Sequence, residues 1–392
     1  MKKYQKVLLV TSGCLILGGG IIMTAGWASG GRVGFQITPA GIRTTEDYQG
    51  EFIEKSVDLK NVKKLNINIS EADIEILEGE NFHLEYGYDN AAQSMKEEVK
   101  DGTYYLTSKY LPRQIYWSAF SFGNMSYQSE DSYVRIYIPK GKQLEDMQIT
   151  DGYGNVTVET ADAKTFIINA ESGDVTVKNL KAQTASLNTD YGSFQMDSST
   201  VTDLTVNNES GEGKVNNLTA EKVNMNFAYG NMSLKDITTD SINLYSESGK
   251  ISVENLAGSG KGKLAKSMVL GAEYGEIYLT NVDASYLEIS SESGDVEGKF
   301  VTATEVKMDI DYGECNMAQL TSQKVEVDSE SGDIDLEMAG KEDEYDISMI
   351  TEYGSATLNG KDYGTSFTRE KGARNKLELK AESGSIKITT EN

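Results

Sequence analysis

The stretch Val223-Asn-Met-Asn-Phe-Ala-Tyr-Gly-Asn-Met-Ser-Leu-Lys-Asp-Ile237 contains the pattern that determines the fold. Apolar residues alternate with polar ones up to Phe227, and again from Met232 onward. This period of two indicates strands that are buried on one face. The parity of the alternation changes at Gly230, and glycine accepts the positive φ that a sharp turn needs. The unit is therefore predicted to be strand, turn, strand and short loop.

The same unit recurs along the chain, and eight of the eleven spacings between its glycines are 19 residues. One unit cannot bury its apolar face alone, so units must stack on one another. Parallel crossovers are right-handed in nearly all proteins. The sequence thus predicts an all-β fold, a right-handed parallel β-solenoid of about twelve 19-residue repeats; a β-propeller is the alternative, but its blades need about 40 residues. The turn glycines are Gly154, Gly173, Gly192, Gly211, Gly230, Gly249, Gly275, Gly294, Gly313, Gly332, Gly354 and Gly384.

The residue before each glycine alternates strictly between tyrosine and serine. By parity this slot should point inward, so we predict that the tyrosines pack in the core. The alternation leaves two coil lengths open. A 19-residue coil, which we favour, would pack large against small residues, whereas a 38-residue coil would place the tyrosines along one edge. The residues are Tyr153, Ser172, Tyr191, Ser210, Tyr229, Ser248, Tyr274, Ser293, Tyr312, Ser331, Tyr353 and Ser383.

An acidic residue lies two positions before the glycine in ten of the twelve units, in a slot predicted to face outward. Such a carboxylate ladder could bind calcium, which takes six to eight oxygen ligands. A calcium-binding β-roll is therefore an alternative function, although the repeats lack the glycine-rich nonapeptide of such proteins. No metal site is assigned and no cofactor is expected. The calcium candidates would be Glu171, Asp174, Glu292, Asp295, Glu330 and Asp333.

Composition narrows the classes of function. The formal net charge is −24, which disfavours nucleic acid as a partner. His83 is the single histidine and precedes the repeats, and no arginine occurs between residues 136 and 368. Catalysis needs unlike groups that converge on a substrate, so we predict that the protein is not an enzyme. A polysaccharide-acting β-helix enzyme is the second alternative. Cys14 and Cys315 are too far apart in the predicted fold to form a disulfide.

The N-terminus predicts a membrane anchor at residues 1–28. Lys2, Lys3 and Lys6 precede an uncharged, largely apolar run from Val7 to Ala28, which is long enough to cross a bilayer as a helix. The lysines should stay cytoplasmic, so the C-terminal domain should be extracellular. A cleaved signal peptide, or a lipoprotein modified at Cys14, is the alternative. Residues 29–50 are predicted to be a linker.

Residues 51–145 are predicted to form a β-rich N-terminal cap, with the solenoid at 146–392. Strands are expected at 64–69, 73–77, 83–86, 103–108 and 133–138. An aromatic loop before the repeats could form a ligand surface, or its side chains could pack under the loop and cap the core. The residues of this possible surface are Tyr116, Trp117, Phe120 and Phe122. The last strand, residues 385–389, has almost no chain after it to cover its edge, so self-association is possible there.

The repeats resemble a family of bacterial β-strand-repeat envelope proteins of unknown function, known as "putative adhesins". The resemblance lies in Glu171-Ser-Gly-Asp-Val-Thr-Val177 and Glu330-Ser-Gly-Asp-Ile-Asp-Leu336, and in the flanking Phe35-Gln-Ile-Thr-Pro-Ala-Gly41, Val134-Arg-Ile-Tyr-Ile-Pro-Lys-Gly141 and Leu358-Asn-Gly-Lys-Asp-Tyr-Gly364. The strict tyrosine–serine alternation departs from the usual pattern of the family. The resemblance implies a location in the cell envelope. We expect a membrane-anchored interaction or sensing module whose partner is an envelope protein or a glycan.

Overall fold

The computed structural model describes residues 3–28, 35–38, 41–44, 51–111, 120–122, 131–260 and 262–391. The chain divides into two compact units. The first comprises residues 1–53, 89–94 and 110–130, and the second comprises 54–88, 95–109 and 131–392.

The first unit contains the helix α1 (Lys3–Ala28) and a small three-stranded sheet. In this sheet β1 (Phe35–Thr38) pairs antiparallel with both β2 (Gly41–Thr44) and β9 (Phe120–Phe122). Two strands thus lie within the segment that the sequence predicts as a linker. Among the described residues, no helix combines the length and the hydropathy that crossing a membrane requires.

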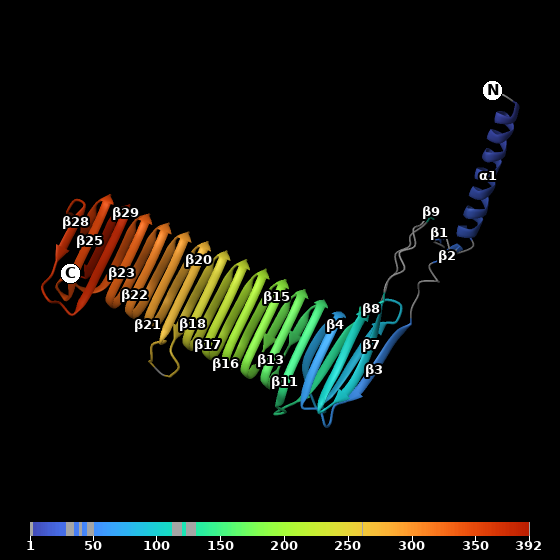
Figure 1. Cartoon of the computed structure of the whole chain (residues 1–392), viewed down its shortest axis with the longest axis horizontal. Helices are drawn as coiled ribbons and strands as arrows, with labels where there is room; N and C mark the ends of the chain where they lie inside the picture. Colours follow the sequence, from blue (N-terminus) through green and yellow to red (C-terminus); the bar gives the residue numbers. More distant parts are fainter. Residues whose placement is uncertain are drawn as a thin grey trace. The chain divides into compact units, whose positions relative to one another are not determined.

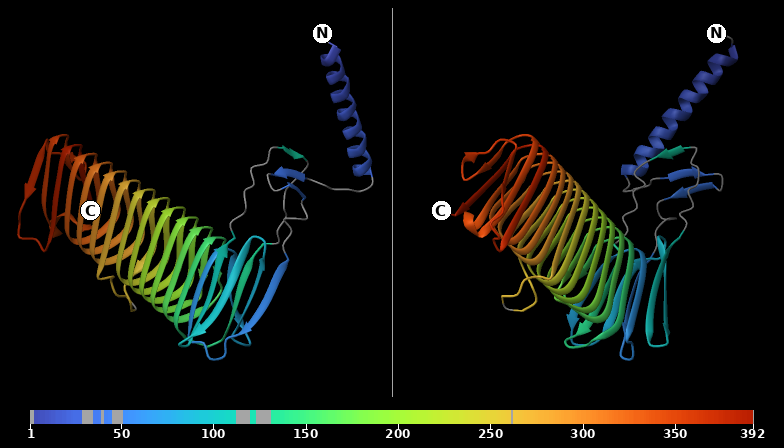
Figure 2. Two further views of the ribbon diagram at one scale, coloured as in Figure 1. Left: turned by 45° about the vertical axis from the view of Figure 1, so that its right-hand side comes forward. Right: turned by 60° about the vertical axis from the view of Figure 1, so that its left-hand side comes forward.

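The second unit is built almost entirely from parallel strands, stacked as successive coils in Figures 1 and 2. Six of these strands run for 17 residues without a break, so about half of the units lack the short loop that the sequence predicts. The strands are β11 (Leu144–Tyr153), β12 (Val156–Val158), β13 (Ala161–Ser172), β14 (Val175–Lys178), β15 (Leu180–Tyr191), β16 (Phe194–Ser210), β17 (Gly213–Tyr229), β18 (Met232–Ser248), β19 (Ile251–Ala257), β20 (Ser267–Tyr274), β21 (Ile277–Ser293), β22 (Val296–Tyr312), β23 (Cys315–Ser331) and β24 (Ile334–Lys341).

The register of these strands shows that one coil takes 19 residues. Phe194 pairs with Gly213, and Asn207 pairs with Asn226. The shorter of the two coil lengths is therefore correct. Where a surface loop interrupts the stack after β19, Ser241 pairs with Ser267, and the extra residues leave the neighbouring pairs unshifted. Stacking in this register places apolar side chains of successive coils over one another in one continuous core.

Each coil has three bends, whereas the sequence predicts one sharp turn and one short loop. In β17 the buried and exposed residues alternate, except where two successive residues face outward: Asn216–Asn217, Glu221–Lys222 and Ala228–Tyr229. The first of these bends has a left-handed backbone, which asparagine and aspartate tolerate better than bulkier residues. The residues with positive φ at this bend are Asn179, Ser198, Asn217, Asp236, Asn255, Asn281, Phe300, Gln319 and Asn359.

At the N-terminal end the order of coils in space differs from their order in the sequence. Both β4 and β5 pair with the first full coil, through β11 and β12, so they form a coil of the solenoid themselves. The outermost parallel layer is β8 and β10, which lie on β4 and β5. Its edge is covered in part by β6, which pairs antiparallel with β10. The strands of this end are β3 (Phe52–Asp58), β4 (Lys64–Glu71), β5 (Asp73–Gly79), β6 (His83–Asp89), β7 (Gln93–Lys100), β8 (Thr103–Tyr110) and β10 (Tyr133–Pro139), which include all five strands expected there.

The C-terminal end is rearranged in a similar way. The chain passes beyond the next coil position to form β25 and β26, turns through β27 and β28, and returns to fill the gap with β29 and β30. The last strand therefore pairs on both sides, and the prediction that its edge is open is wrong. The elements are the 3-10 helix η2 (Glu342–Glu344) and strands β25 (Tyr345–Tyr353), β26 (Ala356–Leu358), β27 (Lys361–Asp362), β28 (Ser366–Arg369), β29 (Asn375–Ser383) and β30 (Ile386–Glu391).

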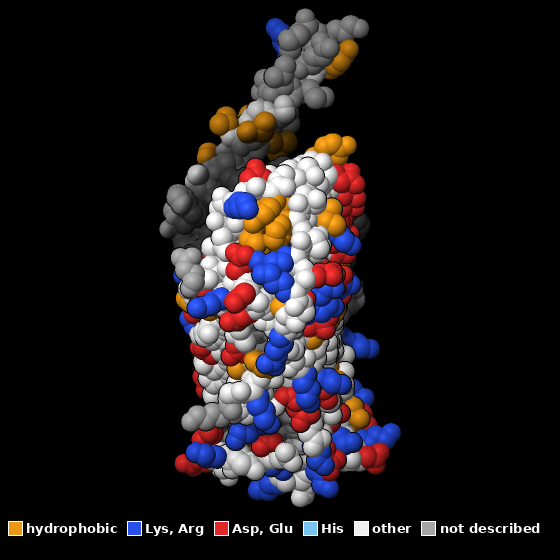
Figure 3. All heavy atoms as spheres, turned by 90° about the vertical axis from the view of Figure 1, so that its left-hand side faces the viewer, with side chains coloured by type: hydrophobic (Ala, Val, Ile, Leu, Met, Phe, Trp, Pro, Cys, Tyr) orange, Lys and Arg blue, Asp and Glu red, His pale blue; other side chains and the backbone are white. Residues whose placement is uncertain are grey.

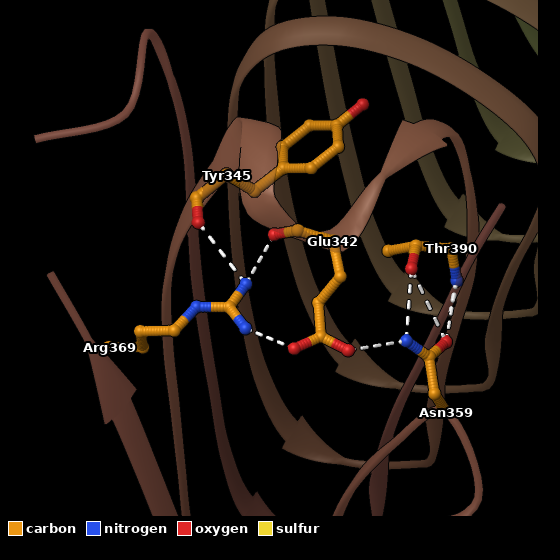
Figure 4. A network of polar contacts seen from close by, with 5 residues as sticks. All are labelled: Glu342, Tyr345, Asn359, Arg369 and Thr390. Atoms are coloured by element: carbon orange, nitrogen blue, oxygen red, sulfur yellow. Dashed lines mark hydrogen bonds and ion pairs between the residues drawn. The ribbon is translucent and has the colours of Figure 1, made fainter. Parts of the chain in front are cut away.

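A polar network holds this end together (Figure 4). Arg369 of β28 donates to the carboxylate and to the carbonyl oxygen of Glu342. The same carboxylate accepts from the amide of Asn359 at 2.7 Å, and Asn359 in turn accepts from the backbone N–H of Thr390 at 2.9 Å. One network thus connects the returning strand β30 to the hairpin strand β28.

Candidate interaction surface

The turn glycines lie in one column along an edge of the solenoid. Ten of the twelve have φ between 132° and 151°, which disfavours any residue with a Cβ. Packing adds a second requirement, because a Cβ on any of the twelve would lie 1.8–2.3 Å from a carbonyl oxygen of the adjoining coil. Each coil therefore rests backbone on backbone at this edge. The structural role that the sequence assigns to the glycines is consistent with this geometry.

The tyrosines before the glycines point outward, so the prediction that they pack in the core is wrong. Their side chains are exposed, Tyr191 by 64% and Tyr353 by 76%. The alternation of faces holds as far as Phe227 in its coil, but the chain then bends, and both Ala228 and Tyr229 face solvent. The parity argument failed because the bend begins two residues before the glycine.

The register of the strands places the tyrosines and serines in one line. From Tyr153 to Tyr312 they alternate coil by coil, so that five tyrosines recur at intervals of two coils. At about 4.8 Å per coil the interval is about 9.6 Å. The rearranged C-terminal end places Ser383 between Ser331 and Tyr353, so the sixth tyrosine follows after three coils instead of two.

Acidic residues flank this line on both sides. Ten acids precede the tyrosine or serine, and they are exposed or half-buried, as the sequence predicts. Six more follow the glycines directly, with Lys250 as the one basic residue in that slot. The two slots together carry sixteen acids and one lysine, a net charge of −15 out of the −24 of the whole chain. We call the six tyrosines, the intervening serines and these flanking residues the tyrosine edge.

The charges on the rest of the solenoid are more evenly mixed. Several are paired between adjacent coils, such as Lys235 with Glu254 at 2.8 Å and Lys324 with Glu305 at 2.7 Å. Figure 3, which faces the C-terminal end, shows acidic and basic side chains interspersed below the upper rim. The tyrosine edge corresponds to the side of the solenoid on which the arrowheads of β15 and β20 lie in Figure 1. The negative charge of the protein is thus concentrated where the tyrosines are exposed.

Three of the six calcium candidates, the aspartates, join successive coils. Asp174 accepts a hydrogen bond from the backbone N–H of Ser193 at 2.8 Å, and Asp295 accepts from that of Glu314, also at 2.8 Å. Asp333 accepts from the backbone N–H of Ser385 at 2.7 Å. These carboxylates join one coil to the next. Within the described parts of the chain, no three acidic, histidine or cysteine side chains come close enough together to hold a metal ion.

Cys315 does not lie in a setting suited to nucleophilic catalysis, and His83 packs against an aromatic ring. The imidazole of His83 stacks on Tyr137, with 4.4 Å between the ring centres, and its Nε2 lies 3.6 Å from Glu85. Cys315 is buried in the core, where desolvation raises the pKa of its thiol to about 12. A thiol with this pKa is not ionised at neutral pH.

One hollow of about 480 Å³ lies on a solenoid face near the C-terminal end. It is lined by residues that include Glu297, Lys299, Asp335 and Lys387. Lys387 and Asp335 form an ion pair at 2.7 Å, so two of the five charged groups, which also include Glu337, neutralise each other. Sequence reasoning did not find this hollow, because its residues come from several coils, from Tyr278 to Thr389, that are distant in the sequence.

The aromatic loop that could form a ligand surface falls largely outside the described residues. Tyr116 and Trp117 lie in that part of the chain. Phe120 and Phe122 belong to β9, of which the structure describes the backbone pairing only. That prediction stays untested.

Comparison with known families gives one match that covers most of the chain. The model of a family described as "Toastrack DUF4097" matches residues 62–254 and 221–389. The match includes the coil of β4 and β5 and both rearranged ends of the solenoid. No curated protein matches the chain.

Solved structures of low similarity also match. A crystal structure titled as a "putative adhesin" from Parabacteroides distasonis is 11% identical, with a TM-score of 0.36, and covers 87% of this chain and 98% of its own. A second "putative adhesin", from Bacteroides fragilis, is 14% identical, with a TM-score of 0.26, and covers 87% and 97%. A "putative lipid binding protein" from Parabacteroides distasonis is 14% identical, with a TM-score of 0.27, and covers 88% and 97%. Likeness at this level carries no argument about what this chain binds.

Proposed function

Because the chain belongs to the Toastrack DUF4097 family, whose function is not known, we propose from its own surface that it is a non-catalytic interaction module that binds an envelope partner through the tyrosine edge. The observation that carries the proposal is the coincidence of exposed tyrosines with most of the net negative charge on one edge. Exposed aromatic side chains in a contiguous array are typical of binding surfaces. A rigid stack of coils holds these side chains at fixed intervals, which favours an extended partner.

We place this module outside the cell, attached to the membrane through α1. The support comes from the sequence, in which 22 residues from Val7 to Ala28 carry no charge and follow three lysines. Protease treatment of intact cells tests this orientation. Cleavage of the solenoid without cell lysis is expected, whereas full protection of the solenoid contradicts it. The right-handed sense of the coils belongs to the same proposal, since it rests on the general preference of parallel crossovers.

Several features support a binding role over catalysis. The coils repeat regularly, and a repeated edge offers many equivalent contacts instead of one site where unlike groups converge. The buried Cys315, whose thiol has a pKa raised to about 12, is unsuited to act as a nucleophile. The hollow beside Asp335 also brings acids and lysines together on a face, so the enzymatic alternative is tested there.

A sedimentation assay tests the proposed function. The full chain in detergent is mixed with isolated bacterial envelopes, and the bound fraction is measured for the wild type and for Tyr191→Ser/Tyr229→Ser/Tyr274→Ser. Serine already occupies the same slot in alternate coils, so the triple variant should fold. We expect it to lose most of the binding, whereas the control Tyr286→Ser, at another bend, retains it. Equal binding by the wild type and the triple variant would contradict the proposal.

The enzymatic alternative has a separate test at the hollow. Wild type and Asp335→Asn are incubated with purified wall and plant polysaccharides, and released reducing ends or unsaturated sugars are measured. We expect no turnover by either protein. Turnover that Asp335→Asn abolishes would assign catalysis to the hollow and overturn the non-catalytic proposal.

A further inference from the structure

We propose that the tyrosine edge binds a cationic polypeptide segment in the polyproline II conformation. This inference rests on the proposed function and names the class of partner. It is carried by three properties of the edge: its charge, its aromatic side chains and its period.

The charge of the edge selects the sign of the partner. Sixteen acids and one lysine flank the line of tyrosines over the full length of the column. Anionic polymers, including nucleic acid and phosphate-rich wall polymers, would be repelled by a net charge of −15. A second copy of this chain would present the same negative edge. A linear partner that carries lysine or arginine is complementary along its whole length.

The tyrosine rings suit cationic and proline side chains. A cation over an aromatic face is attracted by the quadrupole of the ring. The protein already contains such a contact near this edge, where the ammonium of Lys250 lies 3.4 Å from the ring centre of Tyr278. Among the described residues, none of the six tyrosine hydroxyl groups of the edge is hydrogen-bonded, so these side chains are free to contact a partner. Each intervening serine is smaller and leaves room between two rings, as in the aromatic grooves that bind proline-rich segments.

The period of the edge selects the conformation. Successive tyrosines lie two coils apart, about 9.6 Å. A polyproline II helix repeats every three residues, about 9.3 Å, so residues i, i+3 and i+6 project on one side in step with the tyrosines. Over four intervals the mismatch grows to only about 1.2 Å. Two turns of an α-helix take about 10.8 Å, and the mismatch reaches about 5 Å over the same length.

The test uses the full chain and a fluorescent peptide of five Lys-Pro-Pro repeats, which offers one lysine per tyrosine from Tyr153 to Tyr312. Binding is followed by fluorescence anisotropy at about 0.15 M salt, where screening limits long-range attraction. The matched peptides are five Lys-Gly-Gly repeats, with the same charge and a flexible backbone, and five Glu-Pro-Pro repeats, with the opposite charge. Short β-1,4-linked oligosaccharides serve as the rival occupant.

We expect the Lys-Pro-Pro peptide to bind at least about tenfold more tightly than the Lys-Gly-Gly peptide, because the flexible chain must be ordered on binding. The variant Tyr191→Ser/Tyr229→Ser/Tyr274→Ser should weaken the Lys-Pro-Pro peptide about tenfold, whereas Tyr286→Ser should not change its affinity. Circular dichroism confirms that both variants keep the β-sheet signal.

Three outcomes would overturn the inference. The first is that the Lys-Pro-Pro and Lys-Gly-Gly peptides bind with equal affinity and that the triple variant binds them as tightly as the wild type. Binding would then be due to electrostatic attraction alone. Tyrosine-dependent binding of the oligosaccharides without binding of the Lys-Pro-Pro peptide would make the edge a glycan site. Failure of the peptide to bind, with envelope sedimentation still dependent on the tyrosines, would leave the proposed function standing and remove only this partner.

Discussion

At the scale of the residue, the turn glycines carry the largest constraint. The Cβ of an alanine at position 211 would lie 2.1 Å from the carbonyl oxygen of Gly192, in a backbone with φ of 144°. Both atoms belong to the backbone or are attached to it, so neither can move without shifting a coil. The alternating tyrosine and serine beside the glycines face solvent and carry no such constraint.

Gly211→Ala is therefore expected to destabilise the solenoid by more than about 2 kcal/mol, through the combined strain of the backbone and the close contact. Ser210→Ala, one residue away on the same edge, should stay within about 0.5 kcal/mol of the wild type. Urea unfolding followed by circular dichroism measures both. Similar unfolding midpoints for the two variants would show that the coils can separate at this edge.

Asp151, in the first full coil, carries a charge that opposes folding. Its side chain is fully buried, and among the described residues the backbone N–H of Ala72 is the one donor that lowers the pKa of its carboxyl group. Burial, with the nearby carboxylates Asp73, Glu71 and Glu171, raises the pKa of Asp151 to about 7. The equivalent position in later coils holds neutral residues, such as Thr189.

This raised pKa predicts a pH dependence of stability with a definite sign. An acid whose pKa is higher in the folded state binds more protons when folded, so stability falls as the pH rises from about 4 to about 7. Asp151→Asn removes this loss and should raise the unfolding free energy at pH 8, by an amount on the order of 4 kcal/mol at most, with little effect at pH 4. Urea midpoints across this pH range measure it. The exposed carboxylate variant Glu292→Gln is the control, and a wild-type profile that Asp151→Asn leaves unchanged would contradict the assignment.

At the scale of the element, the ends of the solenoid differ from its middle. Strands in the middle pair on both sides with parallel neighbours. At the ends the chain changes to antiparallel pairing, by β6 at one end and by β27 and β28 at the other. Exposed strand edges promote aggregation, and such coverings reduce that hazard. The returning strands β29 and β30 also fasten the last full coil to the terminal hairpins.

The network of Arg369 should control the opening of the C-terminal hairpin. Arg369→Ala leaves the carboxylate of Glu342 with one partner fewer and removes two contacts to backbone carbonyl oxygens. We expect faster hydrogen exchange in β25 and β28, corresponding to about 1–3 kcal/mol of local stability, with unchanged protection in β16–β18. Arg374→Ala, at an exposed position of the same end, is the matched control. Uniform loss of protection along the solenoid would show that the ends and the middle unfold together.

At the scale of the whole molecule, the solenoid is a one-dimensional stack in which each coil contacts its neighbours. The 19-residue register implies that coils can be removed in whole numbers without disturbing the rest. Because tyrosine and serine alternate from coil to coil, removal of two coils at a time also preserves their order on the tyrosine edge.

Deletion of residues 193–230 removes two coils and joins Gly192 to Asn231, so that Tyr191 precedes Ser248 on the edge. We expect this variant to fold, with a modestly lower melting temperature, because the interfaces that remain are of the same kind. Deletion of residues 193–220, about one and a half coils, moves apolar residues out of register and should abolish folding. Circular dichroism and melting curves compare the two. Comparable melting of both variants would contradict the coil length.

The sequence by itself determined the repeat, the glycine turns, the outward acids and the positions of the five strands before the repeats. Each follows from local rules: alternation indicates a buried face, and glycine marks a turn. The resemblance to a β-strand-repeat family of unknown function was also visible in the repeats. The match to the Toastrack DUF4097 model confirms this resemblance.

Only the tertiary structure decided which way the tyrosines face, the three bends of each coil and the order of the coils at both ends. Tyr229 shares the parity of Phe227, and alternation alone cannot show that the chain bends between them. The position of β29 between β23 and β25 depends on pairing with residues as distant as Lys324 with Lys376, 52 positions apart in the sequence. Such pairings are chosen by the free energy of covering open strand edges across the whole stack, which no local pattern records.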